Sequence, residues 1–127
     1  MTHLQAVRDA LLADVVMSAL VGTRIYPSIA PQGVARPFII LRLISAVPHH
    51  THDGAPSDLL EAARVQVDCY GPEYATVHAL ASKVDDVLGA LSGPEISATR
   101  ESAADGYENE TSLHLVSLDY FVQRRRG

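Results

Sequence analysis

Several residue types are scarce in this sequence, and each scarcity excludes a class of protein. The 127 residues include one cysteine, so no internal disulfide can form. No run of about 18 apolar residues occurs, and no basic segment followed by an apolar stretch opens the chain, which argues against a membrane span and a secretory signal. Ten Lys and Arg stand against 15 Asp and Glu. A net charge of −5 argues against a chain that grips nucleic-acid phosphates. From the absence of a span and the single cysteine we expect a soluble protein of a reducing compartment.

Catalytic patterns are scarce as well. No serine lies in a glycine-flanked nucleophile elbow, and neither a phosphate-binding glycine loop nor a dinucleotide fingerprint occurs. Cys69 alternates with residues of an apolar strand face, where burial suppresses thiol reactivity. The carboxylate pairs Asp85 with Asp86 and Glu108 with Glu110 fit a solvated surface better than an acid–base pair. We predict no catalytic residue, no cofactor and no enzymatic activity.

One cluster leaves a metal-binding alternative open. His49, His50, His52 and Asp53 carry imidazole and carboxylate groups, which are good ligands for zinc and related ions. Their spacing matches no strong metal motif, and no second cluster completes a coordination shell. A solvated loop is the favoured interpretation, and we predict no metal site.

Hydrophobic periodicity predicts two helices. Apolar residues recur every three or four positions over Leu4–Ala19, with Thr2 as a candidate cap, so the first helix is expected to end near Leu20 or Val21. Gly22 follows it and suits the left-handed conformation that ends many helices. A second helical pattern covers Val77–Leu91 and ends before a Ser-Gly-Pro stop signal.

Four segments are predicted as strands. Phe38–Ala46 is a short, branched, apolar run between prolines and is expected to be covered on both faces. Over Ala63–Tyr70 apolar and polar residues alternate, which indicates one buried face and one polar face. A weaker strand is expected over Ile96–Ser102, and the last over about Leu113–Gln123. Between the last two, Ala104–Thr111 is expected to be a polar, acidic loop.

This order of elements predicts an α+β fold, with two helices packed on one face of a mostly antiparallel sheet of about four to five strands. A single domain over 1–127 is expected, with a projecting loop at 48–61 and a basic tail at 124–127. The tail is most simply a solubilising charge run, and contact with phosphate or with an acidic patch on a partner is the alternative. The polar face of the sheet would be left open by the helices.

The segment between the first helix and the first strand has the composition of a shaped surface. It holds three prolines and two glycines, which fix the backbone at defined places. Arg24 and Tyr26 are large side chains with polar ends that a plain connector does not need. We therefore expect this linker to make specific contacts.

In order and spacing, these segments resemble the tail-completion proteins of long-tailed bacteriophages, also called tail terminators or head-to-tail joining proteins. The resemblance runs from about Leu4 to Arg124. The residues that carry it are Gly22, Arg24, Ile25, Tyr26, Pro27, Ala30, Pro31, Gln32, Gly33, Pro37, Phe38, Val65, Gln66, Asp68, Tyr70, Ser117, Leu118 and Asp119.

The resemblance implies a structural virion protein that forms a ring, usually a hexamer, at the head-proximal end of a siphovirus-like tail tube. Such a ring would stop tube polymerisation and join tail to head after assembly in the host cytoplasm, in a phage or prophage. The implied partners are further copies of the chain, the tail tube protein and the head–tail connector proteins. Genomic DNA would pass through without specific binding, and no membrane is involved. Another head–tail connector or neck protein is the alternative.

Combining the linker with the polar strand faces gives a candidate interface toward other subunits or partners. Its predicted residues are Arg24, Tyr26, Gln32, Arg64, Gln66, Asp68, Ser117 and Asp119.

Overall fold

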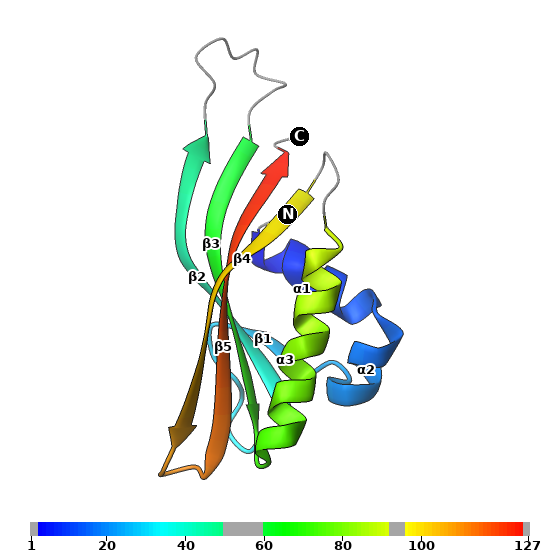
Figure 1. Cartoon of the computed structure of the whole chain (residues 1–127), viewed down its shortest axis with the longest axis vertical. Helices are drawn as coiled ribbons and strands as arrows, with labels where there is room; N and C mark the ends of the chain where they lie inside the picture. The colour runs from blue at the N-terminus through cyan, green and yellow to red at the C-terminus, as the bar shows by residue number, and fades with distance from the viewer. Residues whose placement is uncertain (1–2, 50–59, 92–95, 126–127) are drawn as a thin grey trace.

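The computed structural model describes residues 3–49, 60–91 and 96–125. These form three helices and a five-stranded mixed sheet (Figure 1), so the predicted α+β fold is confirmed. The helices are α1 (His3–Ala13), α2 (Val15–Val21) and α3 (Tyr74–Gly89). The strands are β1 (Ile25–Pro27), β2 (Phe38–His49), β3 (Leu60–Gly71), β4 (Ile96–Glu108) and β5 (Leu113–Arg125).

The predicted continuous first helix is wrong at one residue. Asp14 is extended, with φ −82° and ψ 128°, and divides the segment into α1 and α2. Its carboxylate accepts a hydrogen bond from the Met17 backbone N–H at 2.9 Å, so Asp14 caps α2. An aspartate competes with helix formation in this way, and the two β-branched residues after it add little helix propensity. The predicted cap at Thr2 lies outside the described residues.

The observed helix ends agree only in part with those predicted from the sequence. Gly22 has the expected positive φ of +59°, but its ψ of −123° lies outside the left-handed helical region. Its N–H donates to the Ser18 carbonyl at 2.8 Å and closes α2. The predicted second helix corresponds to α3, which begins earlier, at Tyr74, and ends at Gly89.

The strands lie in the order β1-β2-β3-β5-β4. β1 pairs with β2 in parallel, and the other three pairs are antiparallel. The sequence missed β1, because three residues between turns carry no period. The loop predicted at Ala104–Thr111 is wrong over 104–108, which continues β4 opposite β5 as far as Glu108. The hydrogen-bonded ladder to β5 outweighs the polar composition there, because an exposed edge strand needs no apolar face.

The projecting loop predicted at 48–61 is wrong at its two ends, 48–49 and 60–61. β2 and β3 stay paired up to His49 opposite Leu60, so both ends of that segment belong to strands. Residues 50–59, including His50, His52 and Asp53, lie outside the described residues. β2 also contains more exposed apolar surface than predicted, because Leu43 and Ile44 are 49% and 51% exposed.

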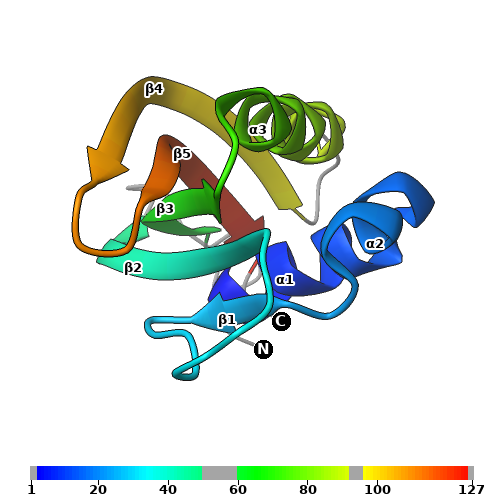
Figure 2. The same ribbon diagram turned by 90° about the horizontal axis from the view of Figure 1, so that it is seen from below.

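All three helices lie on one side of the sheet (Figure 2). The core forms between them and the apolar faces of β2, β3 and β5. The strand alternation predicted over Ala63–Cys69 and in the last strand is confirmed by the buried residues. Core residues from the sheet are Ile25, Ile39, Leu41, Ala63, Val65, Val67, Cys69, Val116, Leu118, Tyr120 and Val122, and those from the helices are Val7, Leu11, Met17, Val21, Val77, Leu80, Ala81, Val84 and Leu88.

Within the described residues, the structure contains no helix long and apolar enough to cross a membrane.

Candidate assembly site

The face of the sheet opposite the helices carries a polar network centred on Asp68 of β3. Asp68 is only 2% exposed. One carboxylate oxygen accepts hydrogen bonds from the Ser117 hydroxyl at 2.6 Å and the Gln66 amide at 2.8 Å. The pairing of Asp68 with Ser117 across β3 and β5 places these side chains on one face. Three of the predicted interface residues thus lie together.

The fourth member of this network, Arg42 of β2, was not predicted. Its Nε donates to the other Asp68 oxygen at 3.1 Å. This hydrogen bond raises the pKa of the Arg42 guanidinium, which stays charged and 45% exposed. The one sequence signal was a single arginine inside an apolar strand. A strand covered on both faces would exclude such a charge, so Arg42 already pointed to an open face.

Two further predicted residues lie on the same face, nearer to β4. Asp119 accepts a hydrogen bond from the Ser102 hydroxyl at 2.8 Å, which joins β5 to β4. Arg64 reaches past β5 and pairs with Glu101 of β4 at 3.1 Å. Both members of this ion pair are well exposed, so they remain accessible to another molecule.

The linker residues separate into one internal clamp and two surface groups. Arg24 donates from Nε to the Pro37 carbonyl at 3.0 Å and from Nη2 to the Leu20 carbonyl at 3.4 Å. The Arg24 guanidinium therefore fastens the two ends of the linker. Tyr26 is partly buried against Phe38 and Ile40 and their neighbours, while Gln32 is exposed.

The linker also covers the lower end of the face away from the helices, which the sequence predicted to be open. Phe38 and Tyr70 stack there with ring centroids 5.0 Å apart. Together with Ile40 and Leu113 they form a second apolar cluster, separate from the main core. Burial raises the pKa of the Tyr70 hydroxyl, which therefore stays protonated at neutral pH.

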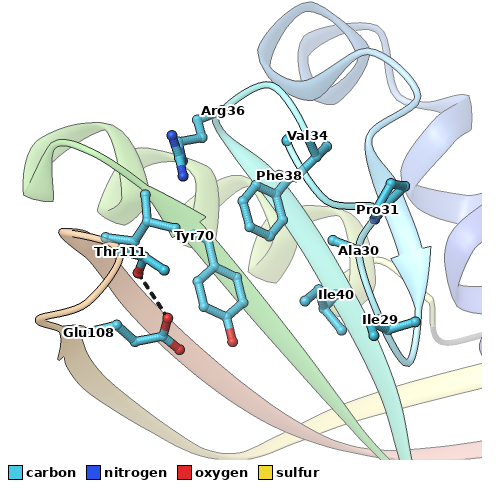
Figure 3. Close-up of a pocket in the computed structure, with 12 residues that line it drawn as sticks. Ile29, Ala30, Pro31, Val34, Arg36, Phe38, Ile40, Tyr70, Glu108 and Thr111 are labelled. Atoms are coloured by element: carbon cyan, nitrogen blue, oxygen red, sulfur yellow. Dashed lines mark hydrogen bonds between the residues drawn. The ribbon is translucent and has the colours of Figure 1, made fainter.

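An open cleft of about 280 Å³ lies between this cluster and the β4–β5 turn (Figure 3). Its floor is apolar, and Arg36 and Glu108 lie on its rim. Glu108 accepts a hydrogen bond from the Thr111 hydroxyl at 3.0 Å, which braces the turn. The sequence did not predict this cleft, because its walls come from three separate parts of the chain, 29–40, Tyr70 and 108–113.

On the helix side, the carboxylate pair predicted as solvated surface is split in role. Asp86 is exposed, whereas Asp85 is half-buried and accepts a hydrogen bond from the Tyr120 hydroxyl at 2.8 Å. Asp85 also pairs with Arg100 at 3.4 Å. These contacts attach α3 to β4 and β5, which is a structural role. Burial raises the pKa of the Tyr120 hydroxyl far above its ordinary range, so it remains a donor.

The remaining candidates for chemistry give no site in the described part of the chain. Cys69 is buried, and burial raises the pKa of its thiol, as its place on an apolar strand face predicted. No group of three or more His, Cys, Asp or Glu side chains is arranged for a metal ion among the described residues. The histidine cluster predicted as an alternative site is not tested, because most of it lies outside those residues.

A comparison with known protein families identifies the family of this chain. The model of the family described as "Tail completion protein gp17" matches residues 5–122. The chain belongs to this tail completion protein family. It is therefore a structural protein of phage-type tails, as the resemblance over Leu4–Arg124 predicted.

A solved structure agrees with this family fold. One chain of a structure entitled "Virion of native gene transfer agent (GTA) particle" superimposes with a TM-score of 0.78 at 21% sequence identity. The match covers 98% of this chain and 95% of that chain, so the fold is shared over nearly the full length of both. No curated protein matches the sequence.

Proposed function

We propose that this tail completion protein is a ring subunit at the head-proximal end of a phage tail tube. In this role a ring, most simply a hexamer, ends polymerisation of the tube protein and provides the surface to which the head connector docks. The observation that carries the proposal is the family match over residues 5–122. The fold supports it, because its helices cover one face of the sheet and leave the part of the other face beyond the linker available for contacts.

The charge of the chain suits a conduit for DNA. A net charge of −5 repels phosphates, so the genome would slide through the ring without being held. The Asp68 network adds a fixed polar surface, while the exposed Arg64, Glu101 and Gln32 supply groups for contact with neighbours. Arg24 acts indirectly, since it shapes the linker on which Gln32 lies.

The native mass of the purified protein tests this proposal. Light scattering over a range of concentrations, with electron microscopy of any large species, is expected to show a closed ring, either alone or after addition of isolated tail tubes. Tubes capped by the protein should also stop growing when fresh tube subunits are added. A monomer that neither assembles nor binds tube ends under any of these conditions would overturn the proposal.

A further inference from the structure

The two edges of the sheet differ in how much of their backbone is already paired. At one edge β1 covers β2 only over Ile39–Leu41. β2 continues to His49, so no described strand pairs with its outer edge from Arg42 onward. At the other edge β4 runs for 13 residues, and β5 is its one partner among the strands that the structure describes. Long open strands offer rows of N–H and C=O groups that pair readily with another strand.

The side chains along these two edges are complementary in size. Leu43 and Ile44 of β2 are half-exposed apolar side chains beside the open edge. β4 is exposed from Thr99 to Glu108 and has small residues at Ala103 and Ala104. Large apolar side chains on one edge can therefore pack over small residues on the other.

The charges of the two edge strands are also complementary. β2 contains Arg42 as its one Asp, Glu, Lys or Arg residue. β4 contains Arg100 against Glu101, Asp105 and Glu108, which gives it a net charge of −2, since one positive and three negative charges are present. Arg42 pairs with Asp68 in its own subunit but remains 45% exposed, so its guanidinium can also face the acidic edge of a second copy.

The strand directions allow the two edges to meet. β2 and β5 are both antiparallel to β3, and β4 is antiparallel to β5, so β4 runs opposite to β2. In a head-to-tail ring all subunits share one orientation relative to the axis. The β4 edge of one subunit therefore approaches the β2 edge of the next as an antiparallel pair.

We propose that the subunits join by β-sheet extension, with β4 of one copy pairing antiparallel with the open part of β2 in the next copy. Each edge strand thus pairs with a strand of another copy of this chain. This inference rests on the proposed ring and deepens it, because it names the seam between subunits. The Arg64–Glu101 pair lies beside this seam, at the irregularity of β4 between Arg100 and Ser102.

Cysteine pairs test the seam directly. Leu43→Cys lies on the helix side of β2, because Leu43 pairs with the core residue Val65. It is combined with one cysteine at a time along β4, and the protein is oxidised under assembly conditions and run on non-reducing gels. Helix-side partners are Ala98→Cys, Arg100→Cys and Ala103→Cys, and the matched opposite-side controls are Thr99→Cys, Ser102→Cys and Ala104→Cys.

Cross-links are expected between subunits for at least one helix-side pair and for none of the controls, because side chains alternate across a strand. Within one subunit β2 and β4 are three strand spacings apart, about 14 Å, which is too far for a disulfide. The native Cys69 is buried and gives little background.

The outcomes separate the seam from the ring. Rings that form without cross-links at any β4 position overturn the seam and leave the proposed function standing. Cross-linked chains without closed rings or tube binding support the seam and overturn the proposed function. Cross-links that form equally at helix-side and opposite-side positions of β4 contradict ordered strand pairing. The absence of both rings and cross-links overturns both proposals.

Discussion

Asp68 is a nearly buried carboxylate on the face of the sheet that the helices leave open. Its neighbours supply three side-chain donors, from Arg42 on one flanking strand, Gln66 on its own strand and Ser117 on the other flanking strand. A buried carboxylate is stable only when such donors replace water. The network therefore ties β2, β3 and β5 together at one point, independently of the apolar core behind them.

Removing this acceptor is expected to weaken the fold. Asp68→Ala leaves the donors of Gln66 and Ser117 without their shared partner, and we expect it to lower the free energy of unfolding by about 2 kcal/mol. Urea unfolding measures the change. The matched control is Asp86→Ala on the exposed side of α3, expected within about 0.5 kcal/mol of the wild type. Equal stability of Asp68→Ala and wild type would show that the network contributes nothing.

Part of this network could be predicted from the sequence. Alternation over Ala63–Tyr70 placed Gln66 and Asp68 on one face, and the same argument placed Ser117 with Asp119. The sequence could not show that Asp68 meets Ser117 and Arg42, because that depends on the register between strands 26 and 49 residues apart. Local periodicity gives the face of each strand, whereas register follows from the packing of the whole sheet.

Among the secondary-structure elements, the break between α1 and α2 depends on Asp14. The Met17 N–H donates to the Asp14 carboxylate and holds its pKa below the ordinary value, with a further contribution from Lys83 at 3.5 Å. The ionised form is therefore favoured by folding. Its stabilising contribution is present above about pH 3.8 and is lost as the pH falls through the lowered pKa of the folded state.

We expect Asp14→Ala to lower the melting temperature at pH 7, because α2 loses its capping acceptor. The difference from wild type should shrink as the pH is lowered below about 3.8, where the wild-type carboxylate becomes protonated. Thermal unfolding followed by circular dichroism from pH 7 to pH 2.5 measures both effects. Asp9→Ala, at an exposed position of α1, is the matched control. A difference that stays constant over this pH range would contradict the role of the ionised cap.

The elements show where sequence patterns succeed and where they fail. α3 and β3 were predicted because each buries one face at its own period, as Val77, Val84 and Leu88 do on α3. β4 was predicted only to Ser102, because its exposed residues 103–108 have no apolar alternation to detect. Its strand conformation comes from the ladder to β5, which no local pattern encodes.

At the scale of the whole molecule, the fold presents an open sheet face and two unlike edges. The sequence predicted the open face from its polar residues and, through the family resemblance, the role in tail completion. It did not predict the cleft of Figure 3, which depends on how the linker packs on the sheet. It also did not predict the open edge of β2, which depends on where the pairing of β1 with β2 stops. The proposed seam at these two edges is therefore an inference from the tertiary structure, whereas the candidate interface on the polar strand faces came from the sequence.

The Arg64–Glu101 pair connects this open face to the edge at β4. Both side chains are exposed, so the pair adds little to the stability of one subunit. Arg64→Glu places a like charge against Glu101 and should push this part of β4 out of position. We expect the variant to fold as the wild type does but to need about tenfold higher concentration to form the proposed ring, equivalent to 1.4 kcal/mol.

Light scattering over a concentration series measures assembly, and circular dichroism reports folding of the same samples. The double variant Arg64→Glu, Glu101→Arg restores the opposite charges with their positions exchanged, and it should recover assembly. Recovery separates the loss of the ion pair from a general effect of added negative charge, because Arg64→Glu with Glu110→Arg has the same net charge without the pair. Unfolding of the Arg64→Glu subunit would contradict the small contribution to stability expected of this exposed pair. If ring formation is unchanged, the pair lies away from the contact between subunits.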